Sequence, residues 1–176
     1  MQDIIEKLKG GDRRSIGRSE EVVSEVRENP ELFDSLIHTI LDDDPIVRMR
    51  AADAVEKVTT DKKFFLQPYK ELILDEISEI EQKEVRWHVA QLLPRLKLTQ
   101  KEVQKAIAIL KNYMSDDSRI VRTFAMDSLA FFAEKDPKLE AWVITLIEEM
   151  VEDGSPAIKS RGKKLLSKLK GVGKID

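Results

Sequence analysis

The sequence of 176 residues contains no cysteine and only two histidines. Without cysteine the chain has no disulfide framework, no thiolate nucleophile and no cysteine-based metal site. Neither His38 nor His88 has the neighbouring residues that would complete a metal site. The sequence also lacks a phosphate-binding glycine loop and a G-x-S-x-G nucleophile motif. We therefore expect no catalytic residue, no metal and no cofactor, and the sequence does not predict an enzyme.

Long apolar runs are also missing. No stretch approaches the ~18 apolar residues that a membrane span requires, and the first residues, MQDIIEKLKGGD, lack the apolar core of a signal peptide. We expect a cytoplasmic protein with no membrane partner. The hydrophobic content of 41% is ordinary for a folded chain. Abundant lysine and glutamate with only two asparagines is a composition typical of thermophile proteins.

A short phrase recurs along the chain, as DDDPIVRMRAADAV at 42–55 and SDDSRIVRTFAMDSL at 115–129. Alignment on its Val-Arg pair gives four copies 36 to 38 residues apart, with Ile-Lys in the last, and a fainter copy upstream at Ser19. The first column reads Val47, Val85, Val121, Ile158, and the column four residues later reads Ala51, Val89, Ala125, Gly162. Apolar residues follow at eight and eleven positions after the first column. These offsets lie on one face of an α-helix, so the repeat predicts a buried helix stripe.

Prolines mark where helices begin. Five of the six follow a polar residue, which is the pattern of a capping side chain before the first helical position. These pairs are Asn29-Pro30, Asp44-Pro45, Gln67-Pro68, Asp136-Pro137 and Ser155-Pro156. Thr99 and Glu102 have the spacing of a capping box. The pattern predicts ten helices in five antiparallel pairs, at 2–9/12–28, 31–42/45–59, 68–80/83–97, 100–115/118–134 and 137–152/155–170.

The sixth proline, Pro94, falls inside the expected helix 83–97. Proline removes a backbone donor and clashes with the carbonyl four residues earlier. We expect a kink or a break there. The tail 171–176 is expected to be frayed.

A helix that opens with D-x-x-x-V-R-x-x-A resembles the second helix of a HEAT repeat, and residues 43–51 and 117–125 carry this motif in full. The resemblance implies an all-α, right-handed α-solenoid of about five antiparallel helix pairs in one domain, 1–176, with repeats near 1–28, 29–60, 66–97, 99–134 and 136–170. Its second helices would line a concave groove. A ladder of Asp–Arg pairs is expected between repeats, from Asp43, Arg48, Arg86, Asp117 and Arg122. Both ends carry polar residues that suit solvent, so a monomer is expected.

Three columns of the repeat, at three, six and ten residues past the first column, should point into that groove. The predicted partner-binding residues are Arg50, Lys57, His88, Gln91, Arg95, Phe124, Asp127, Phe131, Arg161 and Lys164. Phe124 and Phe131 lie two turns apart on one helix face, and aromatic side chains on a solvated face are interface candidates. The alternative is that both belong to the core.

Charge is segregated between the helices of each pair. Residues 45–58, 83–97, 118–133 and 155–170, in the last four expected second helices, carry fifteen basic and four acidic residues, while the whole chain has a net charge of −3. Part of the positive charge is needed for the ladder and for the last helix, where lysines also suit the helix dipole. The remainder would attract an acidic partner into the groove.

Two classes of function fit this surface. The first is a non-catalytic protein–protein interaction scaffold that binds an acidic segment with an apolar anchor. The alternative is nucleic-acid binding along the same basic face. HEAT-like DNA glycosylases use a groove aspartate flanked by aromatic residues, which would point to Asp53 or Asp127. HEAT-like oxygenases with two irons use His-Glu pairs, and neither histidine here is followed by glutamate.

Overall fold

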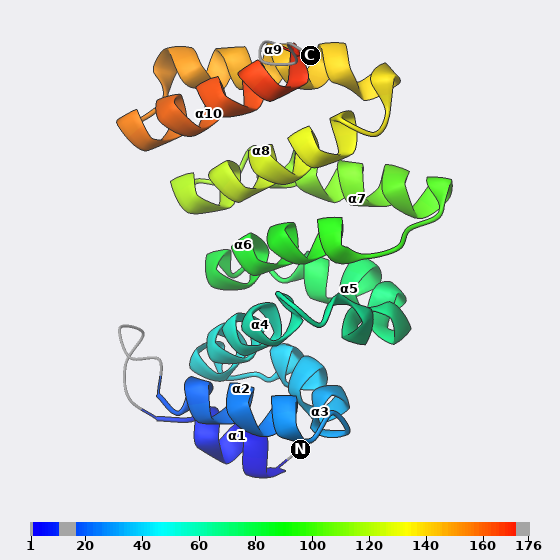
Figure 1. The fold of residues 1–176 in the computed structure, drawn as a ribbon. Helices are drawn as coiled ribbons and strands as arrows, with labels where there is room; N and C mark the ends of the chain where they lie inside the picture. The colour runs from blue at the N-terminus through cyan, green and yellow to red at the C-terminus, as the bar shows by residue number, and fades with distance from the viewer. Residues whose placement is uncertain (1, 11–16, 172–176) are drawn as a thin grey trace. The chain divides into compact units, whose positions relative to one another are not determined.

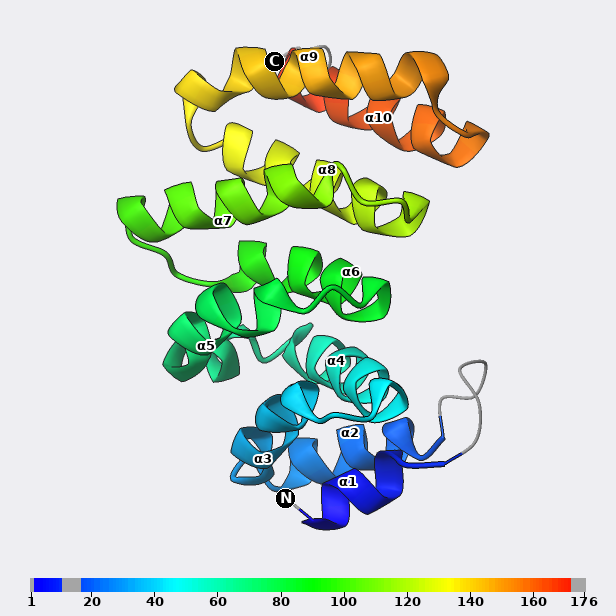
Figure 2. The same cartoon turned by 180° about the vertical axis from the view of Figure 1, so that it is seen from behind.

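The computed structural model describes residues 2–10 and 17–171, and within them the chain forms ten α-helices and no β-strand (Figures 1 and 2). The helices divide into two compact units, Met1–Leu98 (unit 1) and Thr99–Asp176 (unit 2). The predicted all-α class is confirmed. The right-handed winding and the number of helix pairs stay predictions.

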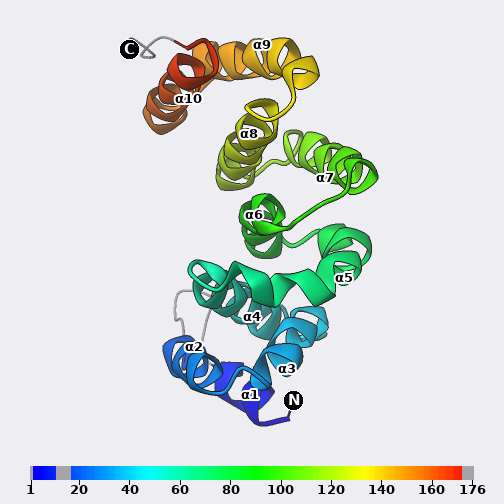
Figure 3. The ribbon, with the colours of Figure 1, turned by 45° about the vertical axis from the view of Figure 1, so that its right-hand side comes forward.

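Unit 1 is arranged around one central helix. Its α-helices are α1 (Gln2–Leu8), α2 (Ser19–Glu28), α3 (Leu32–His38), α4 (Pro45–Thr59), α5 (Lys70–Asp75) and α6 (Lys83–Leu92). Its 3-10 helices are η1 (Thr39–Leu41), η2 (Lys63–Tyr69), η3 (Ile77–Glu79) and η4 (Leu93–Arg95). Helix α4 contacts α1, α2, α3 and α6. Figure 3 shows α2, α4 and α6 along one side of this unit and α3 and α5 along the other.

Unit 2 consists of four longer helices. They are α7 (Gln100–Tyr113), α8 (Arg119–Ala133), α9 (Pro137–Asp153) and α10 (Pro156–Leu169). Helix α8 contacts α7, α9 and α10, and α10 also packs along α9. Within this unit α8 and α10 lie on one side, with α7 and α9 on the other (Figure 3). In each unit the second helices of successive pairs are therefore neighbours.

Most of the predicted helix starts are capped as the sequence indicated. Asp44, Asp136 and Ser155 each accept a hydrogen bond from a backbone N–H in the first turn of the helix that follows, and a proline occupies the first position of each helix. Thr99 and Glu102 form both hydrogen bonds of a capping box at the start of α7. These side chains satisfy N–H groups that have no partner within the helix.

One predicted start is wrong. Pro68 does not open a helix but lies inside η2, and the helix expected at 68–80 is divided among η2, α5 and η3. Helix α3 begins at Leu32, one residue from the expected start at 31, and the carbonyl oxygens of Asn29 and Pro30 accept hydrogen bonds from the backbone N–H groups of Leu32 and Phe33. The start expected at residue 12 and the tail 172–176 lie outside the described residues.

The break expected at Pro94 is confirmed. Helix α6 ends at Leu92, and Pro94 lies in the short 3-10 helix η4. The chain then becomes extended at Leu96, with φ −77° and ψ 143°. The missing N–H of proline ends the α-helical hydrogen-bond pattern at this point.

The apolar columns of the repeat form the cores of the two units. In α4 the residues of the predicted stripe are fully buried, and in α8 and η4 the equivalent residues are also buried. The last copy is less complete, because Leu166 in α10 is half-buried. The column four residues after the first ends with Gly162, and this glycine allows α9 and α10 to approach closely. A Cβ added at Gly162 would overlap the side chain of Val151 in α9.

One of the predicted ladder residues, Arg48, contacts the next repeat in unit 1. Arg48 links α4 to the next repeat by donating from Nε to Oε1 of Gln82 at 2.9 Å. Its Nη1 donates to the backbone carbonyls of Asp42 and Asp43, at 2.9 Å and 3.1 Å, and not to the Asp43 carboxylate. The described residues contain no ion pair between Arg48 and Asp43, and the carbonyls of the turn before α4 accept from Nη1 instead.

The other ladder residues differ in their surroundings. Asp117 is exposed at the turn before α8, and the described part of the chain contains no ion pair between it and Arg122. Arg86 and Arg122 are half-buried in α6 and α8.

Candidate functional site

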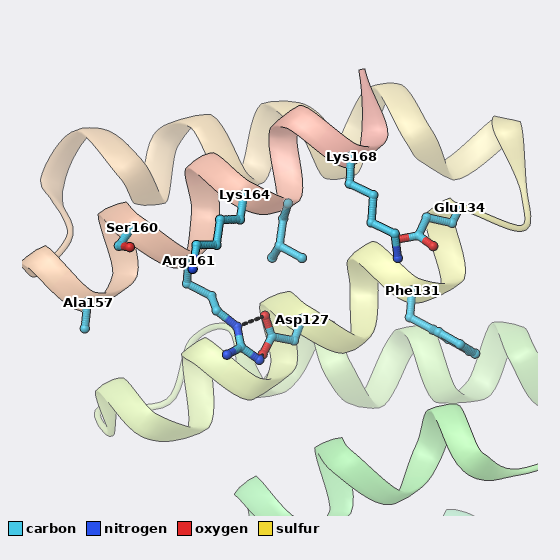
Figure 4. A pocket seen from close by; sticks show the side chains of 9 residues that line it. Asp127, Phe131, Glu134, Ala157, Ser160, Arg161, Lys164 and Lys168 are labelled. Atoms are coloured by element: carbon cyan, nitrogen blue, oxygen red, sulfur yellow. Dashed lines mark hydrogen bonds and ion pairs between the residues drawn. The ribbon is translucent and has the colours of Figure 1, made fainter. Parts of the chain in front are cut away.

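A cleft of about 510 Å³ lies between α8 and α10 in unit 2 (Figure 4). It is lined by Asp127, Phe131, Glu134, Ala157, Ser160, Arg161, Lys164, Leu165 and Lys168. Four of the ten predicted partner-binding residues are among them. All four come from the columns that the repeat pattern assigned to one face of α8 and α10.

Helical spacing explains why these side chains meet. Asp127, Phe131 and Glu134 follow one another at intervals of four and three residues, so they share one face of α8. The opposite face carries Val121 and Ala125, which are fully buried. Burial of the apolar stripe therefore turns the cleft residues of α8 outward.

Two ion pairs join the cleft walls. Arg161 Nε donates to Oδ1 of Asp127 at 2.8 Å, and its Nη2 donates to Oδ2 of the same carboxylate (Figure 4). This bidentate hydrogen bonding raises the pKa of the Arg161 guanidinium above its usual value, whereas partial burial of the side chain lowers that pKa. Lys168 and Glu134 form the second ion pair at 2.6 Å. Both acidic side chains of the cleft are thus occupied by a basic partner from α10.

Lys164 lies on α10 between the two ion pairs, and its ammonium group has no ion pair within the described residues. Three basic and two acidic side chains line the cleft, which gives it a net positive charge. The half-buried ring of Phe131 supplies an apolar surface beside them, and the Lys135 ammonium lies 3.9 Å from its centroid. The cleft therefore combines an aromatic face with one uncompensated cation.

Arg50, the first predicted binding residue in unit 1, is not on the surface. Its side chain is only 1% exposed, and Nη1 lies 2.6 Å from the carbonyl oxygen of Leu8 and 2.6 Å from that of Gly10. The prediction that Arg50 faces a groove is wrong, because the end of α1 packs over this side of α4 and its carbonyls take up the guanidinium.

His88 is also buried, with 7% exposure, so the prediction that it faces a groove is wrong as well. Burial lowers its pKa from 6.5 to about 4, with Glu56 raising it and Lys57 and Arg95 lowering it. The imidazole is therefore neutral at physiological pH. Its Nδ1 is buried without a hydrogen-bond partner among the described residues.

The remaining predicted residues of unit 1 make intramolecular contacts. Arg95 is ion-paired with Glu56 and donates from Nη1 to Thr59 Oγ1 at 3.0 Å. Lys57 is ion-paired with Asp53 at 2.9 Å and also with Glu20. Gln91 donates to the carbonyl oxygen of Trp87 at 3.2 Å. Lys57 and Gln91 are half-buried, so part of each side chain still reaches solvent.

Phe124 is half-buried and does not line the cleft, so the two phenylalanines have different roles. Five residues line the cleft but are not among the ten predicted residues: Glu134, Ala157, Ser160, Leu165 and Lys168. A signal for Ser160 was present, because it precedes Lys164 by four residues on the same helix face. Glu134 was missed because it lies thirteen residues past Val121, beyond the three columns assigned to the groove.

The structure gives no support to catalytic use of the two aspartates. The Asp53 carboxylate is ion-paired with Lys57, and the Asp127 carboxylate is bound by Arg161. Within residues 2–10 and 17–171, no cluster of three or more histidine, aspartate or glutamate side chains could hold a metal ion. No helix in the same part of the chain is long and apolar enough to span a membrane.

Comparison with known protein families identifies the repeat. A model of the HEAT repeat domain matches residues 6–169, which covers nearly the whole chain. HEAT repeats in general act as scaffolds for protein–protein interactions and are typically non-enzymatic. Searches of curated proteins and of solved structures gave no match. The extent of the family match, together with the paired helices and their repeated Val-Arg columns, shows that the chain belongs to the HEAT-repeat family.

Proposed function

We propose that this protein is a non-catalytic interaction scaffold and that unit 2 binds an acidic peptide segment with an apolar anchor in the cleft between α8 and α10. The observation that carries the proposal is the position of Lys164, a cation with no ion pair to any described residue, in the same cleft as the half-buried ring of Phe131. Exposed aromatic side chains in a concave site are common anchors of protein interfaces.

Charge favours an acidic segment. Over residues 155–170 the chain has six basic and no acidic residues, so α10 presents a positive surface along its length. An incoming carboxylate can pair with Lys164 without breaking an existing ion pair. It would also lie near Arg161 and Lys168, which are 54% and 64% exposed despite their ion pairs. Such complementarity raises association rates and selects against basic partners.

The cleft dimensions favour a short segment. A volume of about 510 Å³ lies within the ~300–1,000 Å³ of typical ligand pockets and suits one anchoring side chain with its neighbours. Phe131, Leu165 and Ala157 offer apolar surface to that anchor. The half-buried Lys57 and Gln91 of unit 1 and Phe124 of unit 2 stay predicted contacts of the partner.

The proposal can be tested with synthetic peptides of equal length, measured by fluorescence polarisation. One peptide carries glutamates around a central tryptophan, a second replaces the tryptophan with serine, and a third replaces the glutamates with lysines. We expect the first to bind most tightly. Phe131→Asp and Lys164→Glu should each weaken binding by at least about tenfold. Lys138→Glu, an exposed position on α9 outside the cleft, serves as the matched control and should bind as wild type does.

A single-stranded oligonucleotide tests the alternative in the same assay. If it binds more tightly than the acidic peptides, and if the logarithm of its affinity falls linearly with the logarithm of salt concentration, the function is nucleic-acid binding instead. If the acidic peptide binds wild type and both cleft variants equally, the site assignment is wrong. Circular dichroism of each variant verifies that the helices remain folded.

A further inference from the structure

A second cavity in unit 2, of about 320 Å³, is separate from the peptide cleft. It lies where the start of α8 meets the turn between α9 and α10. It is lined by Arg119, Arg122, Met150, Asp153, Gly154, Ser155 and Ile158. None of these residues lines the cleft described above.

The repeat explains how this cavity arises. In unit 1 the ladder arginine, Arg48, donates to Gln82, the residue three positions before Val85 in the next repeat. Gln82 in turn donates from Nε2 to the carbonyl oxygen of Pro45 at 2.8 Å, so the two repeats are joined in both directions. A glutamine at this column therefore fills the space beside the arginine and satisfies it.

In unit 2 the same two columns hold Arg122 and Ser155, because Ser155 lies three positions before Ile158. The shorter serine does not replace the glutamine: its Oγ instead accepts a hydrogen bond from Ile158 N at 3.4 Å and caps α10. The Nε of Arg122 is buried, and it has no hydrogen-bond partner in the described part of the chain. With serine in place of the glutamine, unit 2 has a cavity here and a buried Arg122 Nε without a hydrogen-bond partner among the described residues.

A second arginine faces the same cavity. Arg119 precedes Arg122 by three residues on α8, and its guanidinium makes no ion pair or hydrogen bond within the described residues. Arg119 is also the first residue of α8, and Ser155 caps α10, so the positive ends of two helix dipoles border the cavity. Asp153 is the one acidic residue of the lining, and it is exposed. The lining therefore has an excess of positive charge.

We propose that this cavity binds a phosphate group, either inorganic phosphate or the phosphate of a small phosphomonoester. Guanidinium groups bind the oxygens of a phosphate through two parallel hydrogen bonds, and two arginines match its charge of about −2. Arg122 and Arg119 supply these donors, and the apolar side chains of Met150 and Ile158 leave room for a small organic body. Phosphate would take the place that Gln82 fills in unit 1.

The test compares thermal unfolding and isothermal titration with inorganic phosphate and with O-phosphoserine, at constant ionic strength set with sodium chloride. Serine, which has the same ammonium and carboxylate groups but no phosphate, is the control for phosphoserine. We expect both phosphate compounds to bind wild type and to raise its Tm in a concentration-dependent way, since a ligand that binds only the folded state stabilises it. Binding of phosphoserine but not of inorganic phosphate would assign the site to phosphomonoesters, and equal binding would assign it to the phosphate group alone.

Two variants act on the site by different means. Arg122→Gln removes a donor, and Ser155→Gln restores the residue that satisfies the ladder arginine in unit 1. Each should weaken phosphate binding by at least about tenfold. Lys163→Gln removes a positive charge from an exposed position of α10 outside both cavities and should bind phosphate as wild type does.

The proposal is overturned if wild type shows no phosphate binding beyond the sodium chloride control, or if Arg122→Gln and Ser155→Gln bind phosphate as tightly as wild type. Ser155→Gln keeps the test decisive if Arg122→Gln does not fold, because a glutamine already occupies this column at a helix start in unit 1.

Discussion

The guanidinium of Arg50 in α4 lies 2.6 Å from the carbonyl oxygen of Leu8, the last residue of α1. Nη1 also donates to the carbonyl oxygens of Lys9 and Gly10, at 3.2 Å and 2.6 Å. The last carbonyls of a helix have no partner within it. The buried side chain of Arg50 therefore caps the C-terminal end of α1 and holds α1 against α4.

We predict that Arg50→Met lowers the free energy of unfolding by about 2–4 kcal/mol, because the carbonyls of residues 8–10 lose a charged donor. Urea denaturation measures the change, and hydrogen exchange should show faster exchange in α1. Arg27→Ala, at an exposed position of α2, is the control and should change stability much less. An Arg50→Met protein as stable as wild type would show that Arg50 does not hold α1.

Burial of His88 predicts a pH dependence of stability. Its pKa is about 4 in the folded protein and 6.5 in an ordinary environment, so between these values the unfolded chain binds a proton that the folded chain does not. Lowering the pH through this window therefore favours unfolding. Because of this imidazole, the free energy of unfolding should be about 2 kcal/mol lower at pH 5 than at pH 7.5.

Urea denaturation at the two pH values measures this effect. Carboxylates also titrate near the lower end, so the informative quantity is the difference between wild type and His88→Gln. The variant should lose less stability than wild type on acidification. Equal losses in the two proteins would contradict a lowered pKa at His88.

The sequence predicted the helices well where local chemistry decides their ends. Thr99 and Asp136 cap their helices through their own side chains, and Pro94 ends α6 through its own ring. These effects involve residues within one turn of each other. A pattern along the chain is then sufficient to locate the helix start or end.

Breaks that preserve the buried face were not predictable in this way. Ile73 and Ile77 are both fully buried, although the α-helix ends between them and Glu76 has φ −121° and ψ −57°. The apolar spacing continues across the break, so the sequence indicates one helix from 68 to 80. Pro68 added to the error because it follows a polar residue, as a proline at a helix start does.

Part of the candidate site could be predicted from the repeat columns. Asp127, Phe131 and Arg161 come from the predicted columns and line one cleft, because burial of the repeat stripe fixes the opposite helix face. The columns failed for Arg50, whose surroundings are set by the end of α1 rather than by the repeat. The repeat pattern of a helix does not predict its contacts with a segment that is not part of the repeat, such as the end of α1.

The close packing of α9 and α10 predicts an effect at Gly162. A Cβ at this position would overlap Cγ2 of Val151 and lie 3.3 Å from Cγ2 of Ile147, which is fully buried. Gly162→Ala gains about 1 kcal/mol of helix propensity but incurs about 1–3 kcal/mol of overpacking. We expect a net loss of roughly 1 kcal/mol in the free energy of unfolding.

Thermal and urea denaturation measure this change. Ser160→Ala, on the exposed face of the same helix, is the matched control and should raise stability by at most about 0.5 kcal/mol. A Gly162→Ala protein more stable than wild type would show that α9 and α10 can separate to admit a methyl group.

The ion pair between Arg161 and Asp127 predicts a variant that binds an acidic segment more tightly. Asp127→Asn removes one of the two acidic charges of the cleft and leaves Arg161 available to an incoming carboxylate. The pair is largely exposed on the Arg161 side, so the free energy of unfolding should change by no more than about 1 kcal/mol. Affinity for the glutamate–tryptophan peptide should rise by roughly two- to tenfold at low salt and less at high salt, because salt screens exposed charges.

Asp117→Asn removes an exposed carboxylate outside the cleft and is the control for net charge. If Asp127→Asn binds the peptide no better than Asp117→Asn does, Arg161 takes no part in recognition and its role is to hold α10 against α8.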